Sequence, residues 1–108
     1  MKPVLQPYVI EASATIEEAW ARIEYNKHRS VVIVEKNKVV GTLSDGDLRK
    51  VILAHRLLTT PVRDVMNTHF VSLPADQKHE AARVLKENNI FLVPIVDKQL
   101  DLLDIIVQ

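Results

Sequence analysis

The chain has 108 residues, of which 47% are hydrophobic and 26% are charged, which suits one compact domain with a single core. Fourteen Lys and Arg residues balance fourteen Asp and Glu residues, so no net field concentrates nucleic acid. The lack of cysteine excludes disulfides and thiolate catalysis, and the four histidines are isolated from one another. No apolar run reaches the roughly 18 residues of a membrane span and no signal-peptide pattern is present, so we expect a cytoplasmic protein without membrane contact.

The first half of the chain predicts a strand followed by a helix. Residues 8–10 have the apolar character of a short strand. Thr15 and Glu18 then form a capping-box pattern, which marks a helix start. Four apolar residues follow at the i, i+3, i+4, i+7 spacing of one helical face: Ile16, Ala19, Trp20 and Ile23. We expect a helix of about three turns that stops near residues 26–28.

Two further strands and a second helix are predicted next. Residues 31–34 are a continuous β-branched run, which is typical of a strand covered on both faces. A polar turn at 35–38 leads into a second short strand at 39–43. Ser44 opens the following helix. We expect its inner side to carry Leu48, Val51, Ile52 and His55.

Several residues recur at a constant distance of 62 positions. Glu18-Ala19 recurs as Glu80-Ala81, and the strand 31–34 recurs as 93–96. The same distance without gaps over this stretch indicates two tandem copies of one unit. The second copy predicts a strand at 70–73, a helix at 76–87 and a strand at 91–96. Residues 57–67, with Thr60-Pro61 and Val65-Met66, predict a short, partly buried connector.

Three features together resemble the CBS domain family. The strands 31–35 and 93–97 both end in an acidic residue. Residues 41–49 read Gly-Thr-Leu-Ser-Asp-Gly-Asp-Leu-Arg and match the family's Gly-x-x-Ser/Thr-x-x-Asp ligand motif. Residues 61–67 read Pro-Val-Arg-Asp-Val-Met-Asn and look like the family's V-x-x-V-M entry into its second repeat. These features span nearly the whole chain.

The resemblance implies an α/β (α+β) fold of two tandem β-α-β-β-α repeats packed about a pseudo-twofold axis. We expect repeat 1 at residues 1–56, a connector at 57–68 and repeat 2 at 69–108. The second repeat departs from the family because residues 98–104 are shortened and lack glycine. Its ligand motif is therefore degenerate, and its final helix is expected to be missing or reduced to residues 104–108.

The intact motif offers what a nucleotide requires. Asp47 presents two carboxylate oxygens, which can accept hydrogen bonds from the 2′- and 3′-hydroxyls of a ribose. Ser44 and the first backbone N–H groups of its helix can face an anion. Gly41 and Gly46 let the backbone approach a ligand closely.

Further candidates lie near this motif in the sequence. The base is expected to lie against Val31, Val32 and Leu43, and His28 and Arg29 are placed to approach the phosphate. The candidate ligand-binding residues are thus Ser44, Asp47, Arg29, Val31, Val32, Leu43, Gly41 and His28. The resemblance implies an adenine nucleotide or other adenosyl ligand, such as AMP, ADP, ATP or S-adenosylmethionine. No cofactor or metal is expected, since residues 45–47 lack the further oxygen ligands of a calcium loop.

Two hypotheses for the function remain open. The first is a regulatory module that senses an adenosyl ligand and controls a fused or partner enzyme. The second is a structural dimerisation module with a decayed site, because Ser44 with Asp47 is also an ordinary helix start. Helices with leftover apolar faces in the two repeats resemble those through which CBS pairs associate, so we expect a homodimer. An enzyme is disfavoured, since no nucleophile–base pair, metal cluster or Gly-rich phosphate loop is found.

The sequence of residues 44–50, Ser-Asp-Gly-Asp-Leu-Arg-Lys, indicates a narrower group within the family. It is similar to CBS pairs found beside sugar-nucleotide nucleotidyltransferases and sugar-phosphate isomerases. A catalytic part of either enzyme is not present in the sequence. A fused or associated enzyme of one of these two classes is therefore the expected partner.

Overall fold

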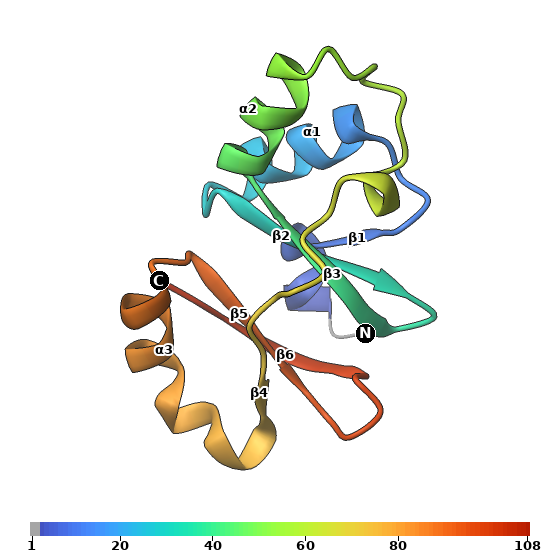
Figure 1. The fold of residues 1–108 in the computed structure, drawn as a ribbon. Coiled ribbons are helices and arrows are strands. Elements are labelled where there is room, and N and C mark those ends of the chain that lie inside the picture. The colour runs from blue at the N-terminus through green and yellow to red at the C-terminus, as the bar shows by residue number, and fades with distance from the viewer. Residues whose placement is uncertain (1–2) are drawn as a thin grey trace.

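Two three-stranded sheets form the centre of the computed structural model, which describes residues 3–108 (Figure 1). In the first sheet, β2 (Ser30–Glu35) lies between β1 (Val9–Glu11) and β3 (Lys38–Ser44). β1 runs parallel to β2, and β3 runs antiparallel to it. The second sheet repeats this topology with β4 (Leu73–Pro74), β5 (Leu92–Val96) and β6 (Leu102–Val107). The mixed fold of two similar halves confirms the fold class expected from the sequence.

Helices cover the outer face of each sheet (Figure 1). In the first half, α1 (Ile16–Asn26) and α2 (Asp45–Leu53) pack over the sheet, and in the second half α3 (Ala81–Asn88) does so. Short 3-10 segments complete the described structure, and they span Pro3–Tyr8, Val62–Asp64 and Ala75–Glu80. No helix among residues 3–108 is long and apolar enough to cross a membrane.

The core has three parts because each sheet has an outer face under helices and an inner face toward the other sheet. The inner faces meet in one cluster, to which Val32, Val34 and Val39 contribute from the first sheet. Leu92, Val96, Leu102 and Ile105 contribute from the second. This shared cluster explains why the run at 31–34 is apolar at every position, since alternate residues face the helices and the opposite sheet.

A pseudo-twofold axis runs between the two strand turns. The Val39 N–H donates to the Leu100 carbonyl at 2.9 Å, and the Leu102 N–H donates to the Asn37 carbonyl at 3.0 Å. These bonds are reciprocal, because each residue pairs with the counterpart of its partner. The matching residues of the two turns are 63 positions apart and not 62. Val34 pairs with Val39 in the first sheet, but Val96 pairs with Leu102 in the second. The second turn is therefore one residue longer than the first.

Both helix starts expected in the first half are present. The Thr15 side chain accepts from the Glu18 N–H at 3.1 Å and caps α1, whose buried face includes Ile16, Ala19 and Ile23. On α2, Leu48 and Val51 are buried as expected. Ile52 and His55 were expected on the inner side as well, and this is wrong. Ile52 is exposed, and His55 lies beyond the helix end with a positive φ.

The second half departs from the sequence prediction in its helix and its last segment. The helix expected at 76–87 is divided at Gln77, whose φ of −112° is not helical, so the α-helix covers only Ala81–Asn88. No side-chain cap bond holds the start of either part. The final helix was expected to be missing or reduced to residues 104–108, and it is missing, because Asp104 to Val107 complete β6 instead.

Asp104 replaces the motif glycine of the first half. It pairs with Ile95 as Gly41 pairs with Ile33. Above Gly41 lies Met66, and the neighbouring Thr42 exchanges backbone bonds with Asn67. In the second sheet Asp104 itself accepts from the Ile105 N–H at 2.8 Å and pairs with Lys78 at 2.5 Å. In the first half the connector thus forms backbone hydrogen bonds with β3, whereas in the second half Asp104 binds the neighbouring Ile105 N–H and Lys78.

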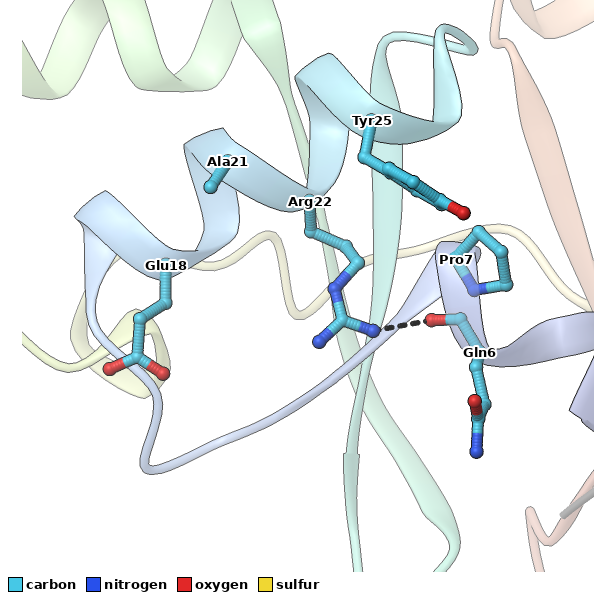
Figure 2. A pocket seen from close by; sticks show the side chains of 6 residues that line it. All are labelled: Gln6, Pro7, Glu18, Ala21, Arg22 and Tyr25. Carbon is cyan, nitrogen blue, oxygen red and sulfur yellow. Dashed lines mark hydrogen bonds between the residues drawn. The ribbon is translucent and has the colours of Figure 1, made fainter.

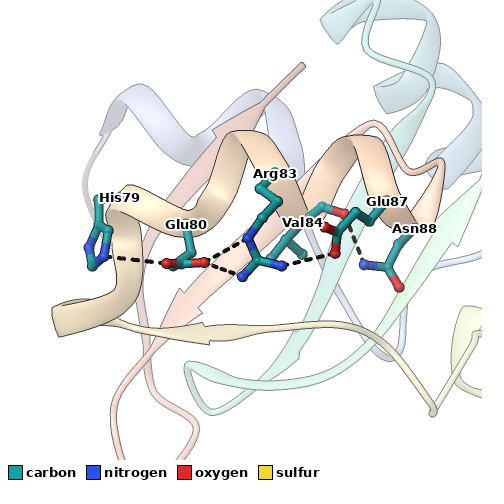
Figure 3. Close-up of polar contacts among 6 residues, drawn as sticks. All are labelled: His79, Glu80, Arg83, Val84, Glu87 and Asn88. Atoms are coloured by element: carbon teal, nitrogen blue, oxygen red, sulfur yellow. Dashed lines mark hydrogen bonds and ion pairs between the residues drawn. The ribbon is translucent and has the colours of Figure 1, made fainter.

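The outer face of α3 is held by a row of charged side chains (Figure 3). Arg83 forms ion pairs with Glu80 and with Glu87, the latter at 2.9 Å, while His79 lies 3.6 Å from Glu80. The hydrogen bond and charge of Arg83 lower the pKa of the Glu80 carboxyl. Such pairs at i,i+3 and i,i+4 support a solvated helix face.

Candidate ligand-binding cleft

A cleft with a volume of about 260 Å³ lies between the start of α2 and the loop that joins α3 to β5. The first half of the chain lines it with Ser30, Thr42, Leu43, Ser44 and Asp47. The connector and the second half line it with Asn67, Val71, Asn89, Ile90, Phe91 and Leu92. We call this the inter-repeat cleft. Three of the residues expected from the sequence, Ser44, Asp47 and Leu43, border it.

Ser44 and Asp47 form a complete capping box at the start of α2. Asp47 Oδ2 accepts from the Ser44 N–H and from the Ser44 hydroxyl, both at 3.0 Å, and the Asp47 N–H donates to Ser44 Oγ at 3.1 Å. The helix-start interpretation of this motif is therefore correct in its geometry. The capping box uses only one oxygen of the Asp47 carboxylate, because Oδ1 accepts no hydrogen bond from the residues that the structure describes.

The opposite wall of the cleft is apolar with two amides. Val71, Ile90 and Phe91 supply apolar surface, which suits a planar base. Asn67 is fixed by its two backbone bonds with Thr42, at 2.8 and 3.1 Å. Asn89 ends α3 in the left-handed conformation, with φ 53°. These amides can donate and accept hydrogen bonds without adding charge.

Arg29 lies at the rim of the cleft and not on its lining. Its guanidinium carbon is 4.6 Å from the centre of the Phe91 ring, and its Nε donates to Asp45 Oδ2 at 2.9 Å. Arg49 approaches the same oxygen at 3.5 Å. Burial raises the pKa of the Asp45 carboxyl, but the hydrogen bond from Arg29 and the charges of both arginines outweigh it, so this pKa lies below its ordinary value.

Val31 and Val32 do not line the cleft, contrary to the sequence expectation. Both are fully buried, Val31 beneath the helices and Val32 between the sheets. A base cannot lie against side chains that the core already covers on each face of β2. Leu43 borders the cleft, but its side chain is also fully buried.

Gly41 and His28 also lie away from the cleft lining. A Cβ on Gly41 would stand 2.6 Å from Met66 Sδ, so the close approach at this glycine is made by the connector. His28 Nδ1 lies 2.8 Å from the Asn26 carbonyl, and its ring meets the Tyr8 ring edge-on. His28 is the counterpart of Ile90, 62 positions on, and it is Ile90 that lines the cleft.

A larger and more open depression lies on the surface of α1 (Figure 2). Its volume is about 650 Å³, and its walls are Gln6, Pro7, Glu18, Ala21, Arg22 and Tyr25. Arg22 Nη1 donates to the Gln6 carbonyl at 2.6 Å and ties the helix to the segment before β1. No candidate residue lies in this depression, and only the first half of the chain forms it. We therefore place the candidate site in the inter-repeat cleft. Residues 3–108 contain no group of three or more His, Cys, Asp or Glu side chains suited to a metal ion.

Comparison with known families agrees with this arrangement of two similar halves. The family model described as the CBS domain matches residues 1–54, which is half of the chain. The chain belongs to the CBS domain family. Among curated proteins it is similar to the arabinose 5-phosphate isomerase GutQ of Shigella flexneri, with 36% identity over 64 residues. That match covers 58% of this chain and 20% of the isomerase, so the chain spans about a fifth of the curated relatives it matches.

Solved structures of CBS domains share the fold. A CBS domain protein from Pyrobaculum aerophilum, complexed with AMP, aligns with a TM-score of 0.77 at 22% identity, over 94% of this chain and 79% of that one. The CBS domain pair of protein MJ0100, in complex with 5′-methylthioadenosine and S-adenosyl-L-methionine, aligns with a TM-score of 0.75 at 22% identity, over 99% and 83%. These structural alignments establish a common CBS-pair fold at low sequence identity.

The pairing of CBS repeats explains which cleft residues the sequence did not reveal. The sequence interpretation surrounded the motif with neighbours from its own repeat, such as His28 and Arg29. The cleft is instead completed across the pseudo-twofold axis by Asn89, Ile90 and Phe91. The 62-residue distance was the available signal, because it relates His28 and Arg29 to Ile90 and Phe91.

Proposed function

We propose that this CBS pair is a regulatory module that binds an adenine nucleotide or another adenosyl ligand in the inter-repeat cleft. One observation carries the proposal: the Ser44–Asp47 motif opens onto a cleft that both repeats line. Asp47 lines this cleft and its Oδ1 could accept from ribose hydroxyls, and the apolar side chains of Val71, Ile90 and Phe91 could enclose the base. Binding between the repeats would couple ligand occupancy to their relative position.

The solved relatives give this proposal its ligand class. The Pyrobaculum protein is complexed with AMP, and the MJ0100 pair is complexed with two adenosyl compounds. For this chain we propose the same class, with AMP, ADP, ATP and S-adenosylmethionine as the compounds to test. The ligand would act as a reversible signal and not as a cofactor. Among the candidate residues we rank Asp47 first, Ser44 second and Arg29 third for binding.

The regulated partner is proposed to be an enzyme. The similarity to the GutQ isomerase covers a fifth of that protein, which supports a fused or associated sugar-phosphate isomerase. A sugar-nucleotide nucleotidyltransferase is the second enzyme class that the motif wording supports. We also propose a homodimer, because α2 and the segment after it expose apolar side chains: Ile52, Leu53, Leu57 and Leu58. We propose the cytoplasm as its location.

A structural dimerisation module is the second candidate function. The complete capping box favours it, since helix capping alone accounts for the bonds of Ser44 and Asp47 within the chain. Calorimetric titration of the purified chain with AMP, ADP, ATP and S-adenosylmethionine separates the two functions. Saturable binding to wild type that Asp47→Asn weakens supports the regulatory module. No heat with any of the four compounds, together with a dimeric mass in light scattering, supports the structural module.

A further inference from the structure

The inter-repeat cleft carries negative charge and no cation on its lining. Of its eleven lining residues, only Asp47 is charged. The remaining polar side chains, which include Thr42, Asn67 and Asn89, are neutral. A phosphate held inside such a cleft would lose water without gaining a lysine or arginine partner, which is costly for a buried charge.

Two arginines beside the start of α2, Arg29 and Arg49, already share a partner. Arg29 donates to Asp45 at 2.9 Å and covers the Phe91 ring, and Arg49 lies 3.5 Å from the same carboxylate oxygen. The lowered pKa of Asp45 keeps that carboxylate charged near neutral pH. To reach a phosphate, either arginine would have to leave an existing ion pair. The start of α2 offers little more, because the Ser44 and Asp47 N–H groups are used in the capping box.

The size of the cleft also disfavours a ligand with phosphate groups. Its volume of about 260 Å³ lies below the roughly 300–1,000 Å³ of sites for drug-sized ligands. A nucleoside fits such a space more readily than a nucleoside di- or triphosphate. The one charged group, Asp47, attracts a neutral hydroxyl donor or a cation and repels an anion.

We propose that the inter-repeat cleft selects adenosyl ligands that lack a phosphate, either neutral or cationic, over adenine nucleotides. This inference rests on the proposed function and narrows its ligand class to nucleosides and their thioethers or sulfonium derivatives. Asp47 holds the ribose, and its charge, without a cation on the lining, acts against a 5′-phosphate. The selectivity therefore comes from repulsion as well as from fit.

Titration calorimetry with adenosine, 5′-methylthioadenosine and AMP tests this selectivity. We expect both nucleosides to bind wild type about tenfold more tightly than AMP at low salt, by like-charge repulsion. The ratio should narrow as salt is raised, because salt screens the repulsion. Thr42→Lys places a cation on the lining, at a half-buried threonine whose side chain forms no hydrogen bond with residues 3–108, and should bring AMP affinity to or above that of adenosine.

Thr59→Lys is the matched control, since it adds the same charge at an exposed loop residue outside the cleft and should leave the ratio unchanged. AMP binding wild type as tightly as adenosine, or Thr42→Lys leaving the ratio unchanged, would overturn the selectivity while the regulatory function stands. Failure of these three compounds and also of ADP, ATP and S-adenosylmethionine to bind wild type would overturn the proposed function itself and this inference with it.

Discussion

The guanidinium of Arg29 lies over the ring of Phe91, with its central carbon 4.6 Å from the ring centre. The two residues are 62 positions apart and occupy matching places just before β2 and β5. Each is therefore the counterpart of the other, and their contact lies where the two repeats meet. Phe91 also lines the inter-repeat cleft, so this contact joins the repeat interface to the candidate site.

The contact between Arg29 and Phe91 should be measurable as a coupling energy. We predict that a double-mutant cycle of Arg29→Gln and Phe91→Leu gives a coupling of about 0.5–1 kcal/mol, the range of a cation–π pair at an exposed site. Urea unfolding of the four proteins at neutral pH provides the measurement. Arg29→Gln removes the ion pair with Asp45 whether residue 91 is Phe or Leu, so the energy of that ion pair cancels in the cycle. Strict additivity of the two substitutions would show that the contact contributes nothing.

Exchanging the residue types at Leu100 and Asn37 should change the free energy of unfolding in opposite directions. Both have positive φ, 68° and 66°, at matching positions, but asparagine tolerates this conformation better than leucine does. We predict that Leu100→Asn raises the free energy of unfolding by about 0.5–1 kcal/mol. Asn37→Leu should lower it by a similar amount. Denaturant unfolding checks both signs, and a loss of stability in Leu100→Asn would contradict the prediction.

The sequence predicted the first repeat better than the second, for a physical reason. Thr15 and Ser44 cap their helices with their own side chains, so both starts are visible as local patterns. The second-repeat helix has no such cap and breaks at Gln77. The strand that ends at Val107 was not predicted, because Asp104 stands where the motif of the first repeat has glycine. The division at residues 57–68 stays a prediction.

The lining of the candidate cleft was predicted only in part, because contacts across the repeats leave no local pattern. Ser44 and Asp47 belong to a contiguous motif and border the cleft, while their role in binding stays a prediction. Asn67 and Phe91 come from other parts of the chain, and only the fold brings them to the cleft. Val31 gave a misleading signal, since an apolar strand next to a motif is equally consistent with a cleft wall and with core, and here it is core.

The two glycines should respond to alanine in opposite directions. A Cβ on Gly41 would meet Met66 Sδ at 2.6 Å, so we predict that Gly41→Ala lowers stability by about 1–3 kcal/mol through overpacking. Gly46 lies in the first turn of α2 with its nearest contact at 3.6 Å, so Gly46→Ala should raise stability by about 0.5 kcal/mol. Thermal unfolding compares them. Adding Met66→Ala to Gly41→Ala should recover part of the loss, and a failure to do so would place the strain elsewhere.

Asp45 predicts a stability difference that depends on pH. Its pKa in the folded chain lies below the ordinary value of 3.8. The stability that it contributes is therefore present above about that pH and lost as pH falls through the lowered pKa. We predict that Asp45→Asn is less stable than wild type by up to about 1 kcal/mol at pH 7, and that the difference shrinks below pH 3.8. Urea unfolding at pH 7 and pH 3 measures it, and a difference independent of pH would rule out an electrostatic cause.

Asp47 has an observed role in the helix cap and a proposed role in ligand binding, and the two can be separated by experiment. The cap uses Oδ2, and Oδ1 accepts no hydrogen bond from the residues that the structure describes. Asp47→Asn keeps the shape of the side chain and removes its charge, so we predict about tenfold weaker adenosyl binding, which corresponds to about 1.4 kcal/mol. Weaker capping should also reduce the free energy of unfolding by about 0.5–1 kcal/mol. Calorimetric titration and thermal unfolding of the same sample report the two effects.

Thr15→Ala separates affinity from stability in this experiment. Thr15 caps α1 as Ser44 caps α2, but it lies outside the inter-repeat cleft. Its loss should reduce the free energy of unfolding by about 1 kcal/mol while adenosyl affinity stays at the wild-type value. If Thr15→Ala weakened binding as much as Asp47→Asn does, the loss of affinity would follow from lower stability. If Asp47→Asn reduced stability and left affinity unchanged, Asp47 would act only as a helix cap, and the structural module would be the better account of this CBS pair.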